Sequence, residues 1–248
     1  REAIARAGIR GEEISCIGLS GQMHGLVALD KAGNPVCPAI IWMDQRSLQE
    51  AKRIAERASD FIGEELLNQP SSGMLVCSLL WLKTNHPELY EKTAAVMLPK
   101  DYIVYKLTGA YVSDYSDASG MLLLDVKNKC WSKEMLDICC ISDIEMPELH
   151  ESFDVVGEVI PEIAEKLNIS GTLKVVAGAG DNAAAAVGTG TVGAGGCNLS
   201  LGTSGTLFIS NDSFSVDDKN SLHSFAHADG GFHLMGCMLS AASCNKWW

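Results

Sequence analysis

The fold is decided by the stretch Val175-Val176-Ala177-Gly178-Ala179-Gly180-Asp181-Asn182-Ala183-Ala184, which continues through glycine-rich sequence to Ile209. Apolar residues from Leu173 to Ala177 predict a buried strand, and small residues from Ala183 to Val187 predict a helix. Asp181 stands where the strand gives way to the helix. Ligands of α/β sheets gather at the carboxyl ends of strands. The stretch therefore predicts a ligand site with one carboxylate at a sheet edge.

Asp181 has two interpretations at this position. It can act as a general base, because Gly178 and Gly180 allow backbone and substrate to approach closely. We expect its pKa to be ordinary, so that the carboxylate is ionised at pH 7 and can accept a hydroxyl proton. It can instead cap the helix that begins near Ala183, a role that aspartate favours. The spacing alone leaves both open.

A second turn, Gly202-Thr203-Ser204-Gly205, joins the apolar runs 198–201 and 206–209. The backbone N–H groups and two hydroxyls of such a turn can bind phosphate oxygens, although ordinary hairpins have the same composition. No Gly-Lys-Ser/Thr sequence occurs, so the turn is not a Walker A loop. Together with Asp181, the turn points to phosphoryl transfer from a nucleotide, which needs alignment, charge neutralisation and a base.

Two further pairs are candidates for sugar contacts. Met23-His24 lies in a loop bounded by glycines, where the imidazole can bind a hydroxyl and the thioether can pack on carbon. A loop histidine with a purely structural partner is the alternative. Trp42 and Asp44 place an aromatic plane beside a carboxylate, although a structural tryptophan is equally consistent with the pattern.

Composition narrows the class of protein. The 248 residues are 47% hydrophobic, which is enough for a sizeable core, and carry a net charge of −12. That charge argues against nucleic acid or an anionic membrane as the main partner. The nine cysteines lack zinc-type spacing, and we expect small buried thiols in a reducing compartment. No run of about 18 apolar residues and no signal-peptide pattern occur, so we expect a cytoplasmic protein.

The remaining pattern predicts an antiparallel start followed by alternating strands and helices, which is an α/β class. Glycine enrichment between Gly188 and Gly196 predicts a domain boundary or hinge. Expected strands are 14–19, 26–29 and 36–42, with a hairpin turn at 30–34; expected helices are 46–58, 78–83, 87–93, 100–108 ending at Gly109, 131–139, and 159–167 with Pro161 in its first turn.

With these residues assembled, the chain resembles the FGGY family of carbohydrate kinases. The resemblance keeps order and spacing over essentially the whole chain. It rests on the segments Gly18-Leu19-Ser20-Gly21-Gln22-Met23-His24-Gly25, Pro38–Arg46, Leu98-Pro99-Lys100-Asp101-Tyr102, Ser113-Asp114-Tyr115-Ser116-Asp117-Ala118-Ser119-Gly120, Gly180–Ala184, Ser200–Gly205 and Leu239–Ser243.

The resemblance implies an actin-like (ribonuclease H-like) α/β fold, with a sugar-binding domain over 1–192 and the start of an ATP-binding domain over 193–248. It implies that Asp181 is the base that activates the C5 hydroxyl of D-xylulose for transfer from ATP with Mg²⁺. The sugar contacts it implies are Met23, His24 and Asn182, with Trp42 and Asp44 as weaker candidates; the turn facing the ATP phosphates is Gly202, Thr203, Ser204 and Gly205. No metal ligand is implied within the chain.

The Met23-His24 pair favours D-xylulose, because glycerol kinases of the family carry Arg-Glu there. A kinase for another ketose or polyol, such as ribulose, is the alternative within the family, and a non-catalytic sugar-binding module is the alternative outside it. We expect small-molecule partners, with a homodimer as a further possibility.

The chain departs from the family pattern in three places. It lacks the initial Asp-x-Gly-Thr-type phosphate loop and most of the ATP domain, so we expect an internal piece of a longer protein that has little activity alone. Ser78 stands where relatives usually carry lysine, which puts one cleft contact in doubt.

Overall fold

A computed structural model describes residues 2–58, 68–169, 172–202, 204–217, 221–238 and 240–248. The α-helices are α1 (Glu2–Ala7), α2 (Leu48–Arg57), α3 (Leu75–Asn85), α4 (Pro87–Tyr90), α5 (Pro99–Thr108), α6 (Tyr115–Ala118), α7 (Lys133–Ile138), α8 (Pro161–Leu167), α9 (Asp181–Gly188) and α10 (Ala242–Trp247). Two short 3₁₀ turns are η1 (Gly11–Glu13) and η2 (Ser119–Met121).

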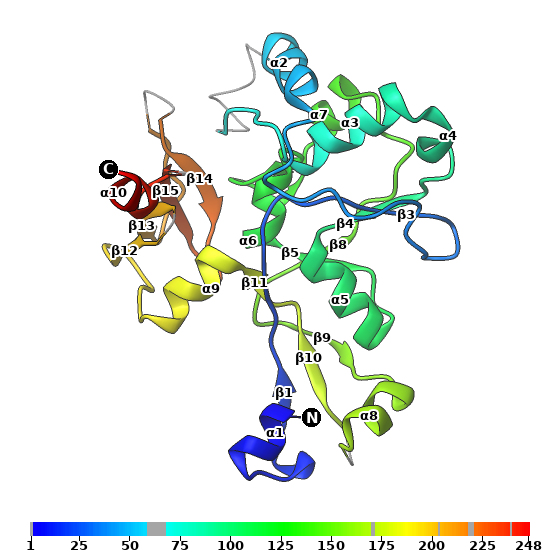
Figure 1. The fold of residues 1–248 in the computed structure, drawn as a ribbon, viewed down its shortest axis with the longest axis vertical. Helices are drawn as coiled ribbons and strands as arrows, with labels where there is room; N and C mark the ends of the chain where they lie inside the picture. The colour runs from blue at the N-terminus through cyan, green and yellow to red at the C-terminus, as the bar shows by residue number, and fades with distance from the viewer. Residues whose placement is uncertain (1, 59–67, 170–171, 203, 218–220, 239) are drawn as a thin grey trace.

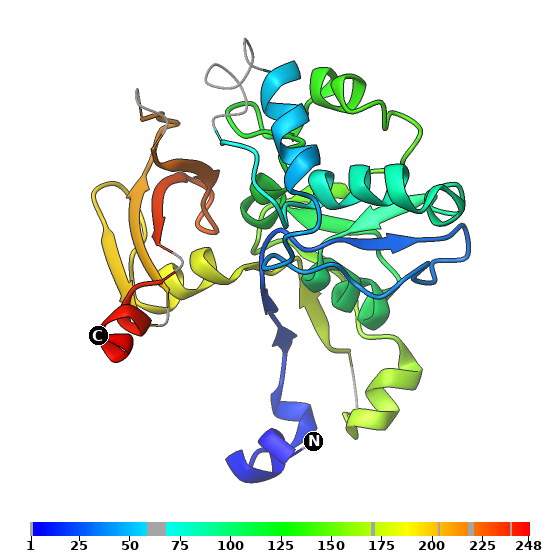
Figure 2. The ribbon, with the colours of Figure 1, turned by 45° about the horizontal axis from the view of Figure 1, so that its top comes forward.

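The strands are β1 (Cys16–Ile17), β2 (Ser20–Gly21), β3 (Val27–Leu29), β4 (Ala95–Met97), β5 (Val112–Asp114), β6 (Leu124–Asp125), β7 (Cys130–Trp131), β8 (Glu148–His150), β9 (Val155–Glu158), β10 (Lys174–Val176), β11 (Ala179–Gly180), β12 (Cys197–Leu201), β13 (Gly205–Asn211), β14 (His223–Ala226) and β15 (Phe232–Met238). Figures 1 and 2 show a larger α/β part and a smaller part made of β12–β15 with α10, with α9 between them.

The first strands pair in parallel with strands from far along the chain. β1 pairs with β10 and β2 pairs with β11, both in parallel. The predicted antiparallel start is therefore wrong for these strands. β3 does pair antiparallel, but its partner is β4. A local pattern indicates that a strand forms, but it does not say which distant strand completes the ladder.

The predicted strand over 36–42 is also wrong. Only two isolated bridges mark this segment, from Leu29 to Pro35 and from Leu26 to Ile40. Proline has no N–H to donate to a ladder, and Pro35 and Pro38 interrupt this run. The turn before it is as expected, because the Asp30 N–H donates to the Asn34 carbonyl at 2.9 Å.

The helices agree better with the sequence pattern. α5 ends at Gly109, whose φ of 81° is the left-handed C-cap that the pattern predicts. α8 begins at Pro161, and α2 and α7 lie inside their predicted ranges. The largest buried cluster joins several of these elements, and its members include Ile54 of α2, Leu79 of α3 and Met121 of η2.

The smaller part is an antiparallel sheet in the order β12-β13-β15-β14. Its first hairpin, β12–β13, confirms the predicted pair of strands around the turn 202–205. No helix in the described ranges is both long enough and apolar enough to cross a bilayer.

The cysteines are less buried than the sequence suggests. All nine fall in described ranges and are free, but only Cys77 and Cys139 are buried. Cys16 and Cys197 are exposed because they lie on β1 and β12, which are edge strands of their sheets. Cys237, near the end of β15, is exposed as well. The expectation of buried thiols is therefore wrong for most of them.

Candidate functional site

Two loops that the sequence singled out meet at one sheet edge. In the register of β2 and β11, Ser20 lies opposite Ala179 and Gly21 lies opposite Gly180. The strands are parallel, so their carboxyl ends point the same way. Met23-His24 follows one strand and Asp181 begins the helix after the other. The pairing thus brings the predicted sugar contacts beside the predicted base.

Met23 forms the floor between these loops. Its side chain is buried and clusters with Phe225 and Met235 of the smaller part. A Cβ placed on Gly180 would lie 3.0 Å from the Met23 Cγ, so the neighbour of Asp181 must be small. Met23 therefore packs against the backbone next to Asp181 and is largely buried, and its role as a sugar contact stays a prediction.

His24 is held in one orientation. Its backbone has a φ of 72°, which is uncommon for a residue other than glycine. A carbonyl oxygen can only accept, so His24 donates its Nδ1–H to Gly120 across 2.8 Å. Burial lowers the pKa of His24, and the bond to Gly120 opposes this shift. The imidazole is therefore neutral near pH 7, and its Nε2 lone pair is left to accept a hydrogen bond from a hydroxyl group.

Asp181 is the first residue of α9, and Gly180 is its N-cap, so the capping interpretation is wrong in its simple form. Asp181 Oδ1 accepts from the Asn182 N–H at 2.9 Å and from the Asn182 side-chain amide at 3.0 Å. The residue surface is exposed. Nevertheless, partial burial of the carboxyl raises the pKa of Asp181, opposed by the bonds from Asn182. The expectation of an ordinary pKa is therefore wrong.

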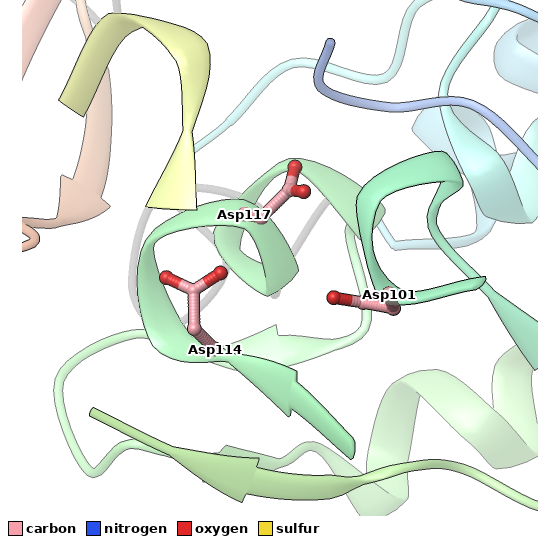
Figure 3. Close-up of side chains that lie close together, drawn as sticks. All are labelled: Asp101, Asp114 and Asp117. Carbon is pink, nitrogen blue, oxygen red and sulfur yellow. The ribbon is translucent and has the colours of Figure 1, made fainter. Parts of the chain in front are cut away.

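A buried charged network lies beside this edge, and the sequence assigned it no role. Figure 3 shows Asp101, Asp114 and Asp117 close together, and one carboxylate oxygen of each lies within 4.8 Å of the other two. The Lys100 Nζ already sits among them, 2.6 Å from Asp101 Oδ1 and 2.9 Å from Asp114 Oδ1. Its ammonium takes the place that a metal ion would need. These residues fall in segments 98–102 and 113–120, two of the segments that carry the family resemblance in the sequence.

The predicted phosphate turn lies at the tip of β12–β13. The Gly202 N–H donates to the Ser204 carbonyl at 2.9 Å, and Ala242 of α10 donates to the Gly202 carbonyl at 2.9 Å. Gly202 and Ser204 are exposed, whereas Gly205 is buried. Thr203 lies outside the described residues. The N–H and the carbonyl of Gly202 are thus both bonded within the protein, and the role of this turn in phosphate binding stays a prediction.

An electrostatic effect links this hairpin to Asp181. Cys237 lies opposite Thr206, the residue that follows the turn. Although the residue surface is exposed, partial burial of the thiol raises the pKa of Cys237, and the negative charge of Asp181 adds to the shift. The charge of Asp181 therefore acts on Cys237 of β15, the strand that pairs with β13.

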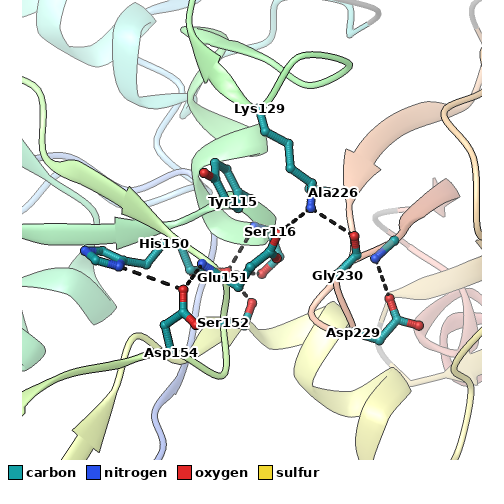
Figure 4. Close-up of polar contacts among 12 residues, drawn as sticks. Tyr115, Ser116, Lys129, His150, Glu151, Ser152, Asp154, Ala226, Asp229 and Gly230 are labelled. Carbon is teal, nitrogen blue, oxygen red and sulfur yellow. Dashed lines mark hydrogen bonds and ion pairs between the residues drawn. The ribbon is translucent and has the colours of Figure 1, made fainter.

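Polar side chains of the larger part hold the smaller sheet in place. The Asn68 amide pairs with both the N–H and the carbonyl of Ser224, each at 3.1 Å. Ser119 Oγ accepts from Ala226 at 3.0 Å. Lys129 donates to the Gly230 carbonyl at 2.9 Å, across the junction drawn in Figure 4. These bonds join β14 to η2 and to Asn68, and the turn after β14 to Lys129.

Among the described residues, no hydrogen bond or ion pair joins the side chain of Trp42 or Asp44 to this edge. Asp44 instead binds Arg46, with its carboxylate oxygens 2.8–2.9 Å from the guanidinium. Ser72 donates to the Asp44 carbonyl at 2.8 Å, so this segment packs on residues near 72. Their role as sugar contacts stays a prediction. Ser78 is fully buried, so the residue in the family's lysine position does not reach the surface.

Comparison with known proteins identifies the family. Residues 1–188 match the N-terminal domain of the FGGY family of carbohydrate kinases. The chain is 41% identical to the xylulose kinase of Escherichia coli K12 over 239 residues and 42% identical to that of Klebsiella pneumoniae over 233 residues. These alignments cover 95% and 93% of the chain, but only 49% and 48% of the relatives, so the chain spans about half their length.

A solved structure agrees with this result. The crystal structure of a "xyloylose kinase" from Brucella ovis superposes with a TM-score of 0.93 at 37% identity, and covers 99% of this chain and 51% of that one. The expected actin-like α/β fold of sugar kinases is thereby confirmed. The resemblance in the sequence motifs is confirmed as well. This chain belongs to the FGGY family of carbohydrate kinases.

Proposed function

We propose that the protein containing this chain transfers the γ-phosphoryl group of ATP to the C5 hydroxyl of D-xylulose, giving D-xylulose 5-phosphate. Residues 1–192 supply the sugar-binding domain and residues 193–248 begin the ATP-binding domain. The proposal is supported by relatives that are xylulose kinases. It rests above all on the parallel pairing of β2 with β11, which sets Met23-His24 beside Asp181.

In this proposal Asp181 is the general base. Its carboxylate accepts the proton of the attacking hydroxyl as the new oxygen–phosphorus bond forms. Asn182 holds one carboxylate oxygen through its amide, so the other oxygen is directed to the substrate. The amide also favours the ionised form, which a base requires.

His24 and Met23 orient the sugar. The neutral imidazole accepts a hydrogen bond from a sugar hydroxyl through Nε2, because Nδ1–H is committed to Gly120. Met23 contacts the carbon face from the floor of the site. A kinase that discriminates by hydroxyl placement gains selectivity from such a fixed acceptor, since a mismatched sugar leaves it unpaired.

ATP approaches from the hairpin side in this scheme, with Gly202, Thr203, Ser204 and Gly205 around its phosphates. Mg²⁺ supplies charge neutralisation of those phosphates. The acidic cluster does not fit this ion, because the Lys100 ammonium fills it. We therefore assign no metal ligand within the described residues. A cytoplasmic location and a homodimer stay predictions.

The test is Asp181→Ala in the full-length protein, compared with Asp143→Ala, an exposed aspartate on a different loop. We expect Asp181→Ala to lower kcat by about 10³-fold, in the range for loss of a general base, with D-xylulose affinity nearly unchanged. Asp143→Ala should behave as wild type. A sugar-binding module would show no turnover at all, and faster phosphorylation of ribulose in a substrate panel would reassign the sugar. The isolated chain should bind sugar but turn over little.

A further inference from the structure

The backbone that leads into Asp181 is held at two points by side chains from other elements. The Lys100 Nζ donates to the Ala177 carbonyl at 2.9 Å, and the Gly180 N–H donates to Ser116 Oγ at 3.2 Å. Between these points, the Gly178 N–H donates to the Ser152 carbonyl at 3.0 Å. The four residues before Asp181 are therefore fixed from α5, from α6 and from the loop after β8.

Both holding side chains belong to one network centred on Asp114. Asp114 Oδ2 accepts from Ser116 Oγ at 2.5 Å and from Ser152 Oγ at 2.7 Å. Asp114 Oδ1 pairs with Lys100 at 2.9 Å. Figure 4 shows Ser116 and Ser152 side by side in this network. Lys100, Asp114 and Ser116 are all essentially inaccessible to solvent, so water does not compete for these bonds.

The network sets the direction of each bond. A carboxylate can only accept, so the single hydroxyl proton of Ser116 goes to Asp114. The Ser116 oxygen is then left as an acceptor, which suits the Gly180 N–H. Burial alone would lower the pKa of Lys100, but the charges of Asp101 and Asp114 outweigh this and raise it. The ammonium stays charged and keeps its three donors.

Lys100 also lies against the other strand of the site. A Cβ on Gly21, the last residue of β2, would lie 2.5 Å from the Lys100 Cβ. The lysine stem therefore runs under the pair β2–β11, just before Met23 on one strand and Asp181 on the other. The buried Lys100 side chain thus contacts both strands that lead into the candidate site.

We propose that Lys100 and Ser116 are positioning residues that hold the Asp181 carboxylate in line for proton acceptance. Neither side chain reaches the open edge where substrate binds, so both act through the backbone from Ala177 to Gly180. The proposal rests on the proposed function of Asp181 as a base. A displacement of about 1 Å at a reacting group can cost up to about 10²-fold in rate.

The primary test is Ser116→Ala in the full-length kinase, with Ser210→Ala as the matched control. Ser210 is equally buried, lies in β13, and its hydroxyl has no partner among the described residues. We expect Ser116→Ala to lower kcat about 10-fold or more while KM for the sugar changes less than about 2-fold. The control should leave both constants near wild type. Equal effects of the two variants would overturn the proposal.

Lys100→Met provides a second, larger perturbation, with folding checked by circular dichroism and thermal melting. In folded enzyme, we expect a greater loss of kcat than in Ser116→Ala. If Lys100→Met does not fold, Ser116→Ala still decides the matter. If Asp181→Ala retains turnover, the proposed function fails. If Asp181→Ala is inactive but Ser116→Ala matches Ser210→Ala, only the positioning proposal fails.

Discussion

Asp181 and Asp117 are two aspartates of the candidate site region that differ in burial and in the hydrogen bonds that their carboxylates receive. Asp181 is exposed and its Oδ1 receives two hydrogen bonds from Asn182. Asp117 is fully buried, and neither of its oxygens has a hydrogen-bond partner among the described residues. Donors at a carboxylate favour its ionised form, whereas burial without donors favours the neutral acid.

The charges around Asp117 strengthen this contrast. Burial raises the pKa of Asp117 well above the ordinary value; Lys100 opposes the shift, and the charges of Asp101, Asp114 and Asp181 add to it. The pKa of Asp181 is also raised by burial, but its bonds from Asn182 counteract the shift. We infer that Asp117 keeps its proton while Asp181 is ionised. Two nearby carboxyls thus take separate roles, one structural and one chemical.

The largest effect should come from Asp114→Asn, which removes the carboxylate at the centre of the buried network beside Asp117. Asp114 is fully buried, where it pairs with Lys100 and accepts hydrogen bonds from Ser116 and Ser152. Breaking a buried pair by removing one partner costs about 3–5 kcal/mol. Urea unfolding at neutral pH should show a loss of this size, with Asp143→Asn as the surface control. A loss under about 1 kcal/mol would show that the network does not stabilise the fold.

A smaller effect should come from Gly120→Ala, which disturbs His24 beside the exposed Asp181. An added Cβ would lie 2.5 Å from His24 Nδ1, so the imidazole must move. We expect sugar affinity to fall about 10-fold, or about 1.4 kcal/mol, with kcat nearly unchanged. Calorimetric titration with D-xylulose measures the sugar affinity. The control is Gly188→Ala, where an added Cβ meets nothing within 4 Å. If Gly120→Ala binds D-xylulose with wild-type affinity, His24 is not a sugar contact.

Asn182→Ala should shift the pH profile. The Asn182 amide stabilises ionised Asp181, so its removal raises the pKa of Asp181 further. Turnover needs the carboxylate and declines as pH falls through that pKa, so the acid limb of kcat should move to higher pH. At neutral pH the loss should be only a few-fold. An acid limb that stays in place, or moves to lower pH, would contradict the assignment of Asp181 as the titrating base.

The smallest effect should come from Asp117→Asn, which mimics a protonated acid. A carboxyl whose folded pKa is raised binds its proton more tightly in the folded state, so its contribution to stability declines as pH rises from the unfolded pKa toward the folded one. Asn removes this decline. The variant should therefore gain stability relative to wild type as pH increases from about 4 to 7, as measured by urea midpoints. A relative loss over that range would show that Asp117 is ionised in the folded protein.

Much of the candidate site was predictable from local sequence. The change from the strands β10 and β11 to α9 at Asp181, the β12–β13 hairpin and the Gly109 cap each follow from residue types within a short window. The association of Met23-His24 with Asp181 came from family resemblance, and the structure supplies its physical cause, the parallel β2–β11 pair. That pair joins residues more than 150 positions apart, which no local period specifies.

What the sequence missed depends on tertiary burial. Lys100, near the start of α5, has the pattern of a surface lysine, and only the fold surrounds it with carboxylates. The raised pKa of Asp181 likewise arises from neighbours brought in by folding. The missing strand over 36–42 has a local cause instead, because Pro35 and Pro38 already disfavour a ladder there.

The most direct measurement is a crystal structure of the full-length protein with D-xylulose bound. We predict the sugar between the ends of β2 and β11, with its C5 hydroxyl about 2.6–3.2 Å from Asp181 and another hydroxyl at the same range from His24 Nε2. A sugar bound elsewhere, or one bound at these strand ends whose C5 hydroxyl points away from Asp181, would contradict the assignment of the base.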